Sequence, residues 1–198
     1  MIEALESEHS KRVMILAHPD DESLFAAGII IRYHGDWSIV CCSIPKRDPI
    51  RAVKFHLACA ALGAQGRTLP WSETRQVPLR GLEAIDLDGV DLVVTHGAAG
   101  EYGHQHHKQV HAFVKSQKPS ESELLTIGYG RVRVDEPSLI VQLSVVEWER
   151  KLSALKSYDH EIDWGGEKRQ TWDALLCEYG TPGRHFGFDL KRECYDRS

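Results

Sequence analysis

Short, continuously apolar runs recur along the chain and alternate with segments of helical spacing. The first run, residues 13–17, is rich in β-branched side chains and has polar neighbours on both sides, which is typical of a strand buried on both faces of a parallel sheet. The same signature predicts strands at residues 37–43 and 90–95, a weaker one at 67–71, and further strands at 124–129 and 138–143.

Helical spacing follows most of these runs. Residues 23–34 carry apolar side chains on one side and stop at Gly35, which predicts one continuous helix. Further helices are expected at residues 49–63, 106–118, 147–156 and 167–179. Strands that alternate with helices favour right-handed crossovers, because each parallel strand needs a covering connection. We therefore predict an α/β fold with a mainly parallel sheet and helices on both faces.

The length of the chain limits the number of domains that it can form. A chain of 198 residues, 42% of them hydrophobic and 27% charged, fits one folded domain and is too short for two. We expect a single domain over residues 1–198, with a flexible N-terminal segment at 1–11 and a variable C-terminal segment at 161–198.

Charge and composition narrow the class of partner. The net charge of −5, with no basic stripe, argues against a nucleic-acid partner and favours a small molecule. No apolar run approaches the roughly 18 residues that a membrane span needs, and the N-terminus lacks the apolar core of a signal peptide, so we expect a cytoplasmic protein. The five cysteines form no Cys-x-x-Cys pair, which predicts reduced, mostly buried thiols. Homo-oligomerisation stays open.

Metal-ligating side chains follow two of the predicted strands. His18, Asp20 and Asp21 come after the first strand, and a histidine-rich segment follows the strand that ends before His96. In a parallel sheet, ligands bind beyond the carboxyl ends of the strands, so we expect both groups at one crevice. A catalytic zinc ion commonly takes two histidines and a carboxylate and keeps a position for water, whose pKa it lowers to about 7.

Spacing alone leaves alternatives open within each group. One of Asp20 and Asp21 can bind a metal while the other accepts a proton from water. His104 and His107 share a helical face, and so do His107 and His111, so either pair could supply a ligand. Two simpler interpretations also exist, because the first group could be only a turn that caps the next helix and the second only a solvated helix face. Their joint position at strand ends favours the metal site.

The sequence resembles the PIG-L family, also called LmbE-like proteins. The motifs that carry the resemblance are Ala17-His18-Pro19-Asp20-Asp21-Glu22, Thr95-His96-Gly97 and Gly100-Glu101-Tyr102-Gly103-His104-x-x-His107. Members of this family have a Rossmann-like fold and hydrolyse N-acetyl groups, usually on glucosamine derivatives, with a divalent metal that is generally zinc. The resemblance spans roughly residues 12–160.

The resemblance implies a role for each matching residue. It makes His18, Asp21 and His107 the metal ligands and Asp20 the general base. His104 becomes the acid or electrostatic partner, Tyr102 a donor to the oxyanion, and Arg51 a residue that faces the substrate. The implied cofactor is Zn²⁺, with Fe²⁺ or another divalent metal as the alternative, and no organic cofactor is expected.

Three departures from the family pattern concern the substrate. His106 stands where the family usually has an aspartate, Lys54 replaces a helix glutamate, and Asp159-His160 replaces Ser-Gln. We expect a zinc-dependent de-N-acetylase that releases acetate from an N-acetylated amino sugar such as N-acetylglucosamine, or from a sugar conjugate. A metal-dependent amidase or deformylase acting on a non-sugar or nucleotide-like amide, and a non-catalytic ligand-binding protein, are the alternative functions.

Overall fold

A seven-stranded sheet forms the centre of the computed structural model, which describes residues 2–45, 50–69, 72–73, 84–101, 103–128, 137–158 and 191–197. The strand order is β4-β2-β1-β6-β7-β9-β8. The strands of this sheet are β1 (Arg12–Leu16), β2 (Trp37–Cys41), β4 (Gln65–Thr68), β6 (Leu92–Thr95), β7 (Glu123–Ile127), β8 (Leu139–Gln142) and β9 (Arg192–Arg197). A small parallel pair is made by β3 (Ile44–Pro45) and β5 (Ser72–Glu73).

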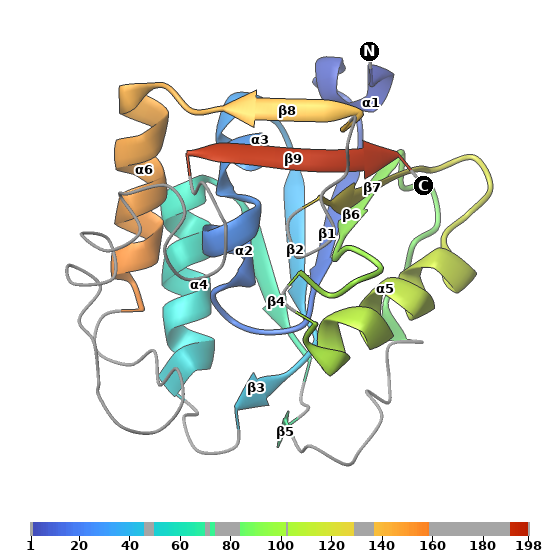
Figure 1. Ribbon diagram of the computed structural model, residues 1–198, viewed down its shortest axis with the longest axis horizontal. Helices are drawn as coiled ribbons and strands as arrows, with labels where there is room; N and C mark the ends of the chain where they lie inside the picture. The colour runs from blue at the N-terminus through green and yellow to red at the C-terminus, as the bar shows by residue number, and fades with distance from the viewer. Residues whose placement is uncertain are drawn as a thin grey trace.

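Helices cover both faces of the sheet (Figure 1). On one face, α3 and α6 pack together and α4 lies beside α6, over an apolar core that includes Ile29, Phe55 and Leu155. On the other face, α5 places Val110 and Val114 against the sheet. The described helices are α1 (Glu3–Glu6), α2 (Asp21–Phe25), α3 (Ala27–Arg32), α4 (Ile50–Leu62), α5 (Gln105–Gln117) and α6 (Val145–Lys156). None of them is long and apolar enough to cross a membrane.

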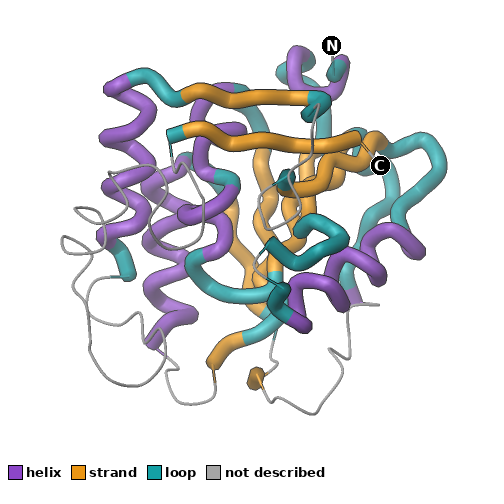
Figure 2. Tube along the Cα trace, viewed as in Figure 1, coloured by secondary structure: helices purple, strands orange, loops and turns teal. Residues whose placement is uncertain are grey.

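The sheet has the predicted mainly parallel topology. Strands β1, β2, β4, β6 and β7 pair in parallel, and only β9 runs antiparallel to its neighbours β7 and β8. The chain first moves outward from β1 to β2 and β4, and then adds β6 on the other side of β1 (Figure 1). Figure 2 shows the strands in orange with purple helices on both sides of them. The order of connection therefore reverses between β1 and β6. Such a reversal point opens a crevice at the carboxyl ends of the two strands.

The prediction of one continuous helix over residues 23–34 is wrong. The chain instead forms α2 and α3, with Ala26 at φ −139° and ψ 12° between them. The N–H groups of Gly28 and Ile29 donate to the carboxylate of Glu193 at 2.7 and 3.1 Å. The buried carboxylate satisfies donors that the start of a helix leaves without intrahelical partners, so a new helix can begin there.

Strand β9 was not predicted. Its sequence is polar, but two residues on the same face of the strand, Glu193 and Tyr195, point into the interior and are fully buried. The hydroxyl of Tyr195 and the ammonium group of Lys151 both donate to Glu193, at 2.6 and 2.7 Å. The predicted helix at 167–179 lies outside the described residues, as do Asp48, Pro49, Asp159 and His160.

A buried guanidinium joins the N-terminal segment to the sheet. Arg12 in β1 is 1% exposed and donates to backbone carbonyls of α1 and of the turn that follows α3, including those of Ala4 at 2.8 Å and His34 at 2.8 Å. Ile2 and Leu5 are buried in the same region. These carbonyl groups belong to one segment that precedes β1 in the sequence and one that follows it. Arg12 therefore connects the two segments through hydrogen bonds.

Candidate metal centre

The loop after β1 turns sharply at its metal-ligating residues. The backbone N–H of His18 donates to Oδ2 of Asp21 at 2.8 Å, which closes the turn. Between them, Asp20 adopts φ 113°, a left-handed conformation that non-glycine residues rarely take. The Asp20 side chain makes no capping hydrogen bond to α2 within the described residues. The turn therefore brings the Asp21 carboxylate back to His18 without using Asp20 as a helix cap.

Three side chains from two segments converge at this loop. Nδ1 of His18 lies 3.1 Å from Nε2 of His107 and 3.5 Å from Oδ2 of Asp21. Oδ1 of Asp21 lies 3.5 Å from Nε2 of His107. Four zinc ligands at 2.0–2.1 Å in a tetrahedron stand about 3.3 Å apart, so this spacing fits three ligands of one ion. The residues also match zinc in kind, with two imidazoles and one carboxylate.

Glu101 orients the imidazole of His107. Its Oε2 lies 2.5 Å from Nδ1 of His107 and 3.1 Å from Nδ1 of His96, and its Oε1 accepts from the N–H of Gly97 at 2.9 Å. Despite burial, interactions with the two imidazoles lower the pKa of Glu101 to about 2, so the carboxylate is ionised. An ionised acceptor at Nδ1 holds the proton there and leaves the Nε2 lone pair of His107 directed at His18 and Asp21.

His96 supports the same arrangement from the end of β6. Its ring stacks on that of His107, with centroids 3.8 Å apart and an angle of 16° between planes. The N–H of Ala17 donates to Nε2 of His96 at 2.9 Å, which links the ends of the two adjacent strands. His96 is fully buried, so its own ring is held in place. Because the ring of His107 stacks on it, the position of His107 is fixed as well.

The charges of the convergent side chains suit a cation. Burial opposes ionisation of Asp21, but the imidazoles of His107 and His96 and hydrogen bonds from histidines hold its pKa well below the usual value. Burial lowers the pKa of His107, which favours the neutral imidazole that a metal requires. Asp21 thus offers a negative charge, and His107 offers a neutral nitrogen ligand.

Asp20 pairs with a cation from α4. The Nη2 group of Arg51 donates to Oδ2 of Asp20 and also to the carbonyl of Pro19, at 2.5 Å in the second case. Burial raises the pKa of Asp20 to about 6, and Arg51 opposes that rise. The carboxylate is therefore largely ionised at neutral pH and able to accept a proton. The structure brings the predicted residue Arg51 to this loop.

Glu22 connects the loop to the end of α6. Its Oε1 accepts from the hydroxyl of Tyr158 at 2.7 Å and from that of Ser23 at 2.6 Å, and its Oε2 accepts from the N–H of Asp20 at 3.1 Å. Burial raises the pKa of Glu22 to about 7. These bonds hold the backbone of Asp20 in its left-handed conformation.

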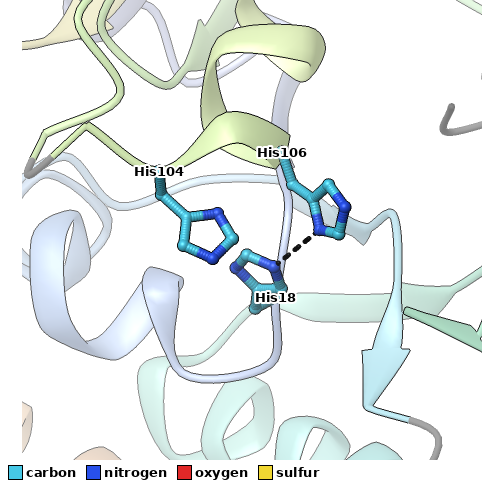
Figure 3. A group of neighbouring side chains, drawn as sticks. All are labelled: His18, His104 and His106. Atoms are coloured by element: carbon cyan, nitrogen blue, oxygen red, sulfur yellow. Dashed lines mark hydrogen bonds between the residues drawn. The ribbon is translucent and has the colours of Figure 1, made fainter. Parts of the chain in front are cut away.

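The predicted residue His104 lies at the start of α5. His104 precedes the helix, and its ring meets that of His18 edge-on with centroids 4.6 Å apart (Figure 3). His111 instead donates from Nδ1 to the carbonyl of His96 at 2.9 Å. Among the described residues, His111 belongs to no group of three or more side chains that could hold a metal ion. The pair of His107 and His111 left open by spacing is therefore not brought together as ligands. Tyr102 lies outside the described residues.

Solved structures with the same fold cover nearly the whole chain, although no family model matches the sequence. The N,N'-diacetylchitobiose deacetylase from Pyrococcus horikoshii is 15% identical, with a TM-score of 0.61 over 99% of this chain and 89% of that chain. The zinc-inhibited form of teicoplanin deacetylase Orf2 is 13% identical, with a TM-score of 0.61 over 95% of this chain and 99% of that one. The chain shares the fold of these two deacetylase structures.

Another structure with this fold carries a different reaction. The 4-carboxy-2-hydroxymuconate hydratase GalB from Pseudomonas putida KT2440 is 14% identical, with a TM-score of 0.58 over 94% of this chain and 95% of that chain. The mostly parallel sheet and the shared fold confirm the predicted Rossmann-like α/β class. Because proteins with this fold differ in reaction, the chemistry has to be argued from the site.

Sequence reasoning assigned no role to Glu101, Glu22 or the ring of His96. Glu101 and His96 stand inside the quoted motifs, but their roles depend on contacts between the ends of different segments. A signal was present in the ligand histidine itself, since the second ring nitrogen of a metal ligand usually donates to a carboxylate or carbonyl. That rule predicts a partner for His107 without saying which of the nearby acids supplies it.

Proposed function

We propose that the chain is a metal-dependent de-N-acetylase that hydrolyses the amide of an N-acetylated amino sugar or sugar conjugate to a free amine and acetate. The observation that carries this proposal is the convergence of Nδ1 of His18, Nε2 of His107 and the carboxylate of Asp21, with Asp20 beside them on the same loop. Deacetylases with the same fold support the acetyl group and the sugar as substrate features.

The proposed ligands would hold one divalent ion, which we assign as zinc from two imidazoles and one carboxylate. When bound, such an ion polarises a carbonyl oxygen and lowers the pKa of water to about 7. The fit rests on the spacing of 3.1 to 3.5 Å between the ligand atoms. Ferrous iron accepts the same ligands, so metal analysis must decide between them.

The other side chains would handle protons and charge. Asp20 would accept a proton from the attacking water, and its link to Arg51 keeps the carboxylate in place for that role. His104, beside His18, would protonate the departing amine or stabilise negative charge on the former carbonyl oxygen. Tyr102 is proposed as a further donor to that oxygen. The reaction consumes one water and yields one acetate and one amine.

The test is acetate release by the full chain loaded with Zn²⁺. N,N'-diacetylchitobiose, N-acetylglucosamine and a glycoside of N-acetylglucosamine would be compared with formylated and non-sugar amides. We expect acetate and free amine in equal amounts from N-acetylated sugars. Asp20→Asn should lower kcat by at least about 100-fold, the size typical of a general base, while metal content stays at the wild-type value.

Other functions predict different outcomes, and hydration needs a substrate and a readout of its own. Hydrolysis confined to formylated or non-sugar amides would support the amidase or deformylase alternative. Addition of water to a carboxylated dienol, without release of acetate, would indicate a hydratase like GalB. Metal binding without any turnover would support a non-catalytic protein, and full activity in Asp20→Asn would contradict the assignment of the base.

A further inference from the structure

Tyr158 follows the end of α6 and contacts the metal-ligating loop from a distant part of the sequence. Its backbone N–H donates to the carbonyl of Leu155 at 3.0 Å, and its side chain belongs to the apolar core, with 3% of the residue exposed. Its hydroxyl donates to Oε1 of Glu22 at 2.7 Å, across 136 positions of the sequence. Since α6 and the core hold the ring, the hydroxyl presents a fixed donor to the loop.

The carboxylate of Glu22 transmits this restraint to Asp20. Glu22 is fully buried, and its Oε2 accepts from the backbone N–H of Asp20 at 3.1 Å. The hydroxyl of Ser23 also donates to Oε1, at 2.6 Å, but Ser23 is the next residue of α2 and moves with Glu22. Among the described residues, Tyr158 is thus the donor that ties this carboxylate to a different element. Because a carboxylate is rigid and planar, fixing Oε1 also fixes the direction of Oε2.

Asp20 needs this support because its backbone conformation is strained. Residues other than glycine rarely adopt a φ of 113°, and they keep it only where the surroundings hold it. Arg51 holds the side chain of Asp20 from α4, whereas Glu22 holds its backbone. If the backbone contact is lost, the peptide can relax to an unstrained conformation, and the carboxylate then changes direction.

We propose that Tyr158 is a positioning residue for Asp20 and acts through Glu22. The inference rests on the proposed function, in which Asp20 is the general base. Tyr158 takes no part in the bond changes, but its hydroxyl sets the direction of the carboxylate that accepts the proton. A displacement of about 1 Å can lower a rate by about 100-fold, so a hydroxyl remote from the reacting atoms can determine kcat.

The first test is Tyr158→Phe in the full chain loaded with Zn²⁺, because this substitution removes the hydroxyl and keeps the ring in the core. We expect kcat for an N-acetylated sugar to fall by about tenfold or more and KM to change by less than about twofold, since the base acts only in the chemical step. The affinity for Zn²⁺ should keep its wild-type value, because a separate hydrogen bond from the N–H of His18 to Asp21 closes the ligand turn.

Tyr195→Phe is the matched control. The hydroxyl of Tyr195 also donates to a buried carboxylate, that of Glu193 at 2.6 Å, whose other donors include Lys151 and the start of α3. This variant should lose stability in urea denaturation to a similar extent but keep the wild-type kcat. Equal losses of kcat in the two variants would mean that the hydroxyls act only through stability, which overturns the positioning role.

A double variant shows whether the effect runs through the base. Tyr158→Phe should lower kcat in the wild type but not in Asp20→Asn, where no carboxylate remains to be positioned. A further loss of about tenfold in the double variant would contradict the proposal.

Amide hydrogen exchange tests the contact independently of activity. In the metal-free chain, the N–H of Asp20 should exchange at least about tenfold faster in Tyr158→Phe than in the wild type, and at the wild-type rate in Tyr195→Phe. Heteronuclear NMR spectroscopy measures these rates. An Asp20 N–H that exchanges without protection in the wild type overturns the proposal, even if Tyr158→Phe does not fold. Faster exchange in Tyr158→Phe, in a protein that releases no acetate, would support the positioning of Asp20 and contradict the proposed function.

Discussion

Oε2 of Glu101 lies 2.5 Å from Nδ1 of His107, on the edge of the imidazole opposite the atom proposed to bind metal. This contact fixes both the tautomer and the direction of the ligand. We therefore expect Glu101→Gln to lower the affinity for Zn²⁺ by about 10 to 100-fold, the usual effect of removing such a partner. Competition with a chromophoric chelator measures the affinity.

An exposed acid provides the control for this substitution. Glu121→Gln removes one negative charge from the surface at the opposite end of α5 and should leave the affinity unchanged. Equal losses in both variants would mean that only net charge matters, and an unchanged affinity in Glu101→Gln would show that the contact does not orient the ligand.

Arg51 offers a way to distinguish positioning from substrate binding. Because its guanidinium bonds Asp20 and the carbonyl of Pro19, we expect Arg51→Met to lower kcat at least about tenfold and to change KM less. Arg51→Lys should recover part of kcat, since a lysine keeps the charge but not the planar fork. Steady-state kinetics on the best N-acetylated substrate measure both constants.

The opposite pattern would assign Arg51 to the substrate. A raised KM with unchanged kcat indicates a contact that substrate and transition state share equally. Arg67→Met, at an exposed position of β4, is the matched control and should leave both constants at wild-type values.

The buried pair of Lys151 and Glu193 holds α6, α3 and β9 together. Both side chains are fully buried, and Glu193 also accepts from the N–H groups at the start of α3. Lys151→Met leaves a buried carboxylate without its cation, so we expect the free energy of unfolding to fall by about 3 to 5 kcal/mol. Urea denaturation measures this change, and exposed Lys156→Met should cost far less. A loss below about 1 kcal/mol would contradict the expected dependence on the pair.

The ion pair of Arg32 and Glu147 predicts a pH dependence of stability. Hydrogen bonds from Arg32 lower the pKa of Glu147 to about 2, from an ordinary value of 4.5. A carboxyl whose pKa is lower in the folded state stabilises the protein above its unfolded pKa, and that contribution is lost as the pH falls through the folded pKa. The stabilisation is therefore complete above about pH 5 and disappears towards pH 2.

Glu147→Gln measures the contribution of this pair. We expect the variant to be less stable than the wild type by about 1 kcal/mol at pH 7, and the difference to shrink between pH 5 and pH 2. Thermal unfolding followed across that range, with exposed Glu149→Gln as the control, tests the prediction. A difference that does not vary with pH would contradict it.

The apolar runs predicted the parallel strands because those strands are buried on both faces. Residues 13–16 and 92–94, for example, are apolar without interruption, as expected for strands with side chains buried on both faces of the sheet. The break between α2 and α3 could not be read locally, because its cause is Glu193, which lies 165 residues beyond Gly28. The polar sequence of β9 hid its buried face for the same reason, since the buried charge is satisfied only in the fold.

The candidate site was likewise predictable from the sequence only in part. Metal-ligating side chains after two strands predicted a metal site, and the resemblance to the PIG-L family implied His18, Asp21 and His107 as its ligands. The structure brings the ligand atoms of these three residues together. The part played by Glu101 depends on where β6 and α5 meet, and that meeting point has no local signature. Hydrophobic periodicity predicts helices and strands, and residue types indicate a metal site. The hydrogen-bond partners of a metal-ligating side chain depend on how distant segments pack together.

The left-handed backbone of Asp20 has a consequence for how this loop can change over evolutionary time. Glycine adopts φ near 113° without strain, whereas an aspartate there costs on the order of 1 to 3 kcal/mol. Replacement of Asp20 by glycine would therefore relieve this strain and stabilise the fold. The need for the carboxylate opposes that replacement. In a related protein that no longer needs the carboxylate, we would expect His-Pro-Gly-Asp in this loop. That sequence would indicate that the reaction had been lost.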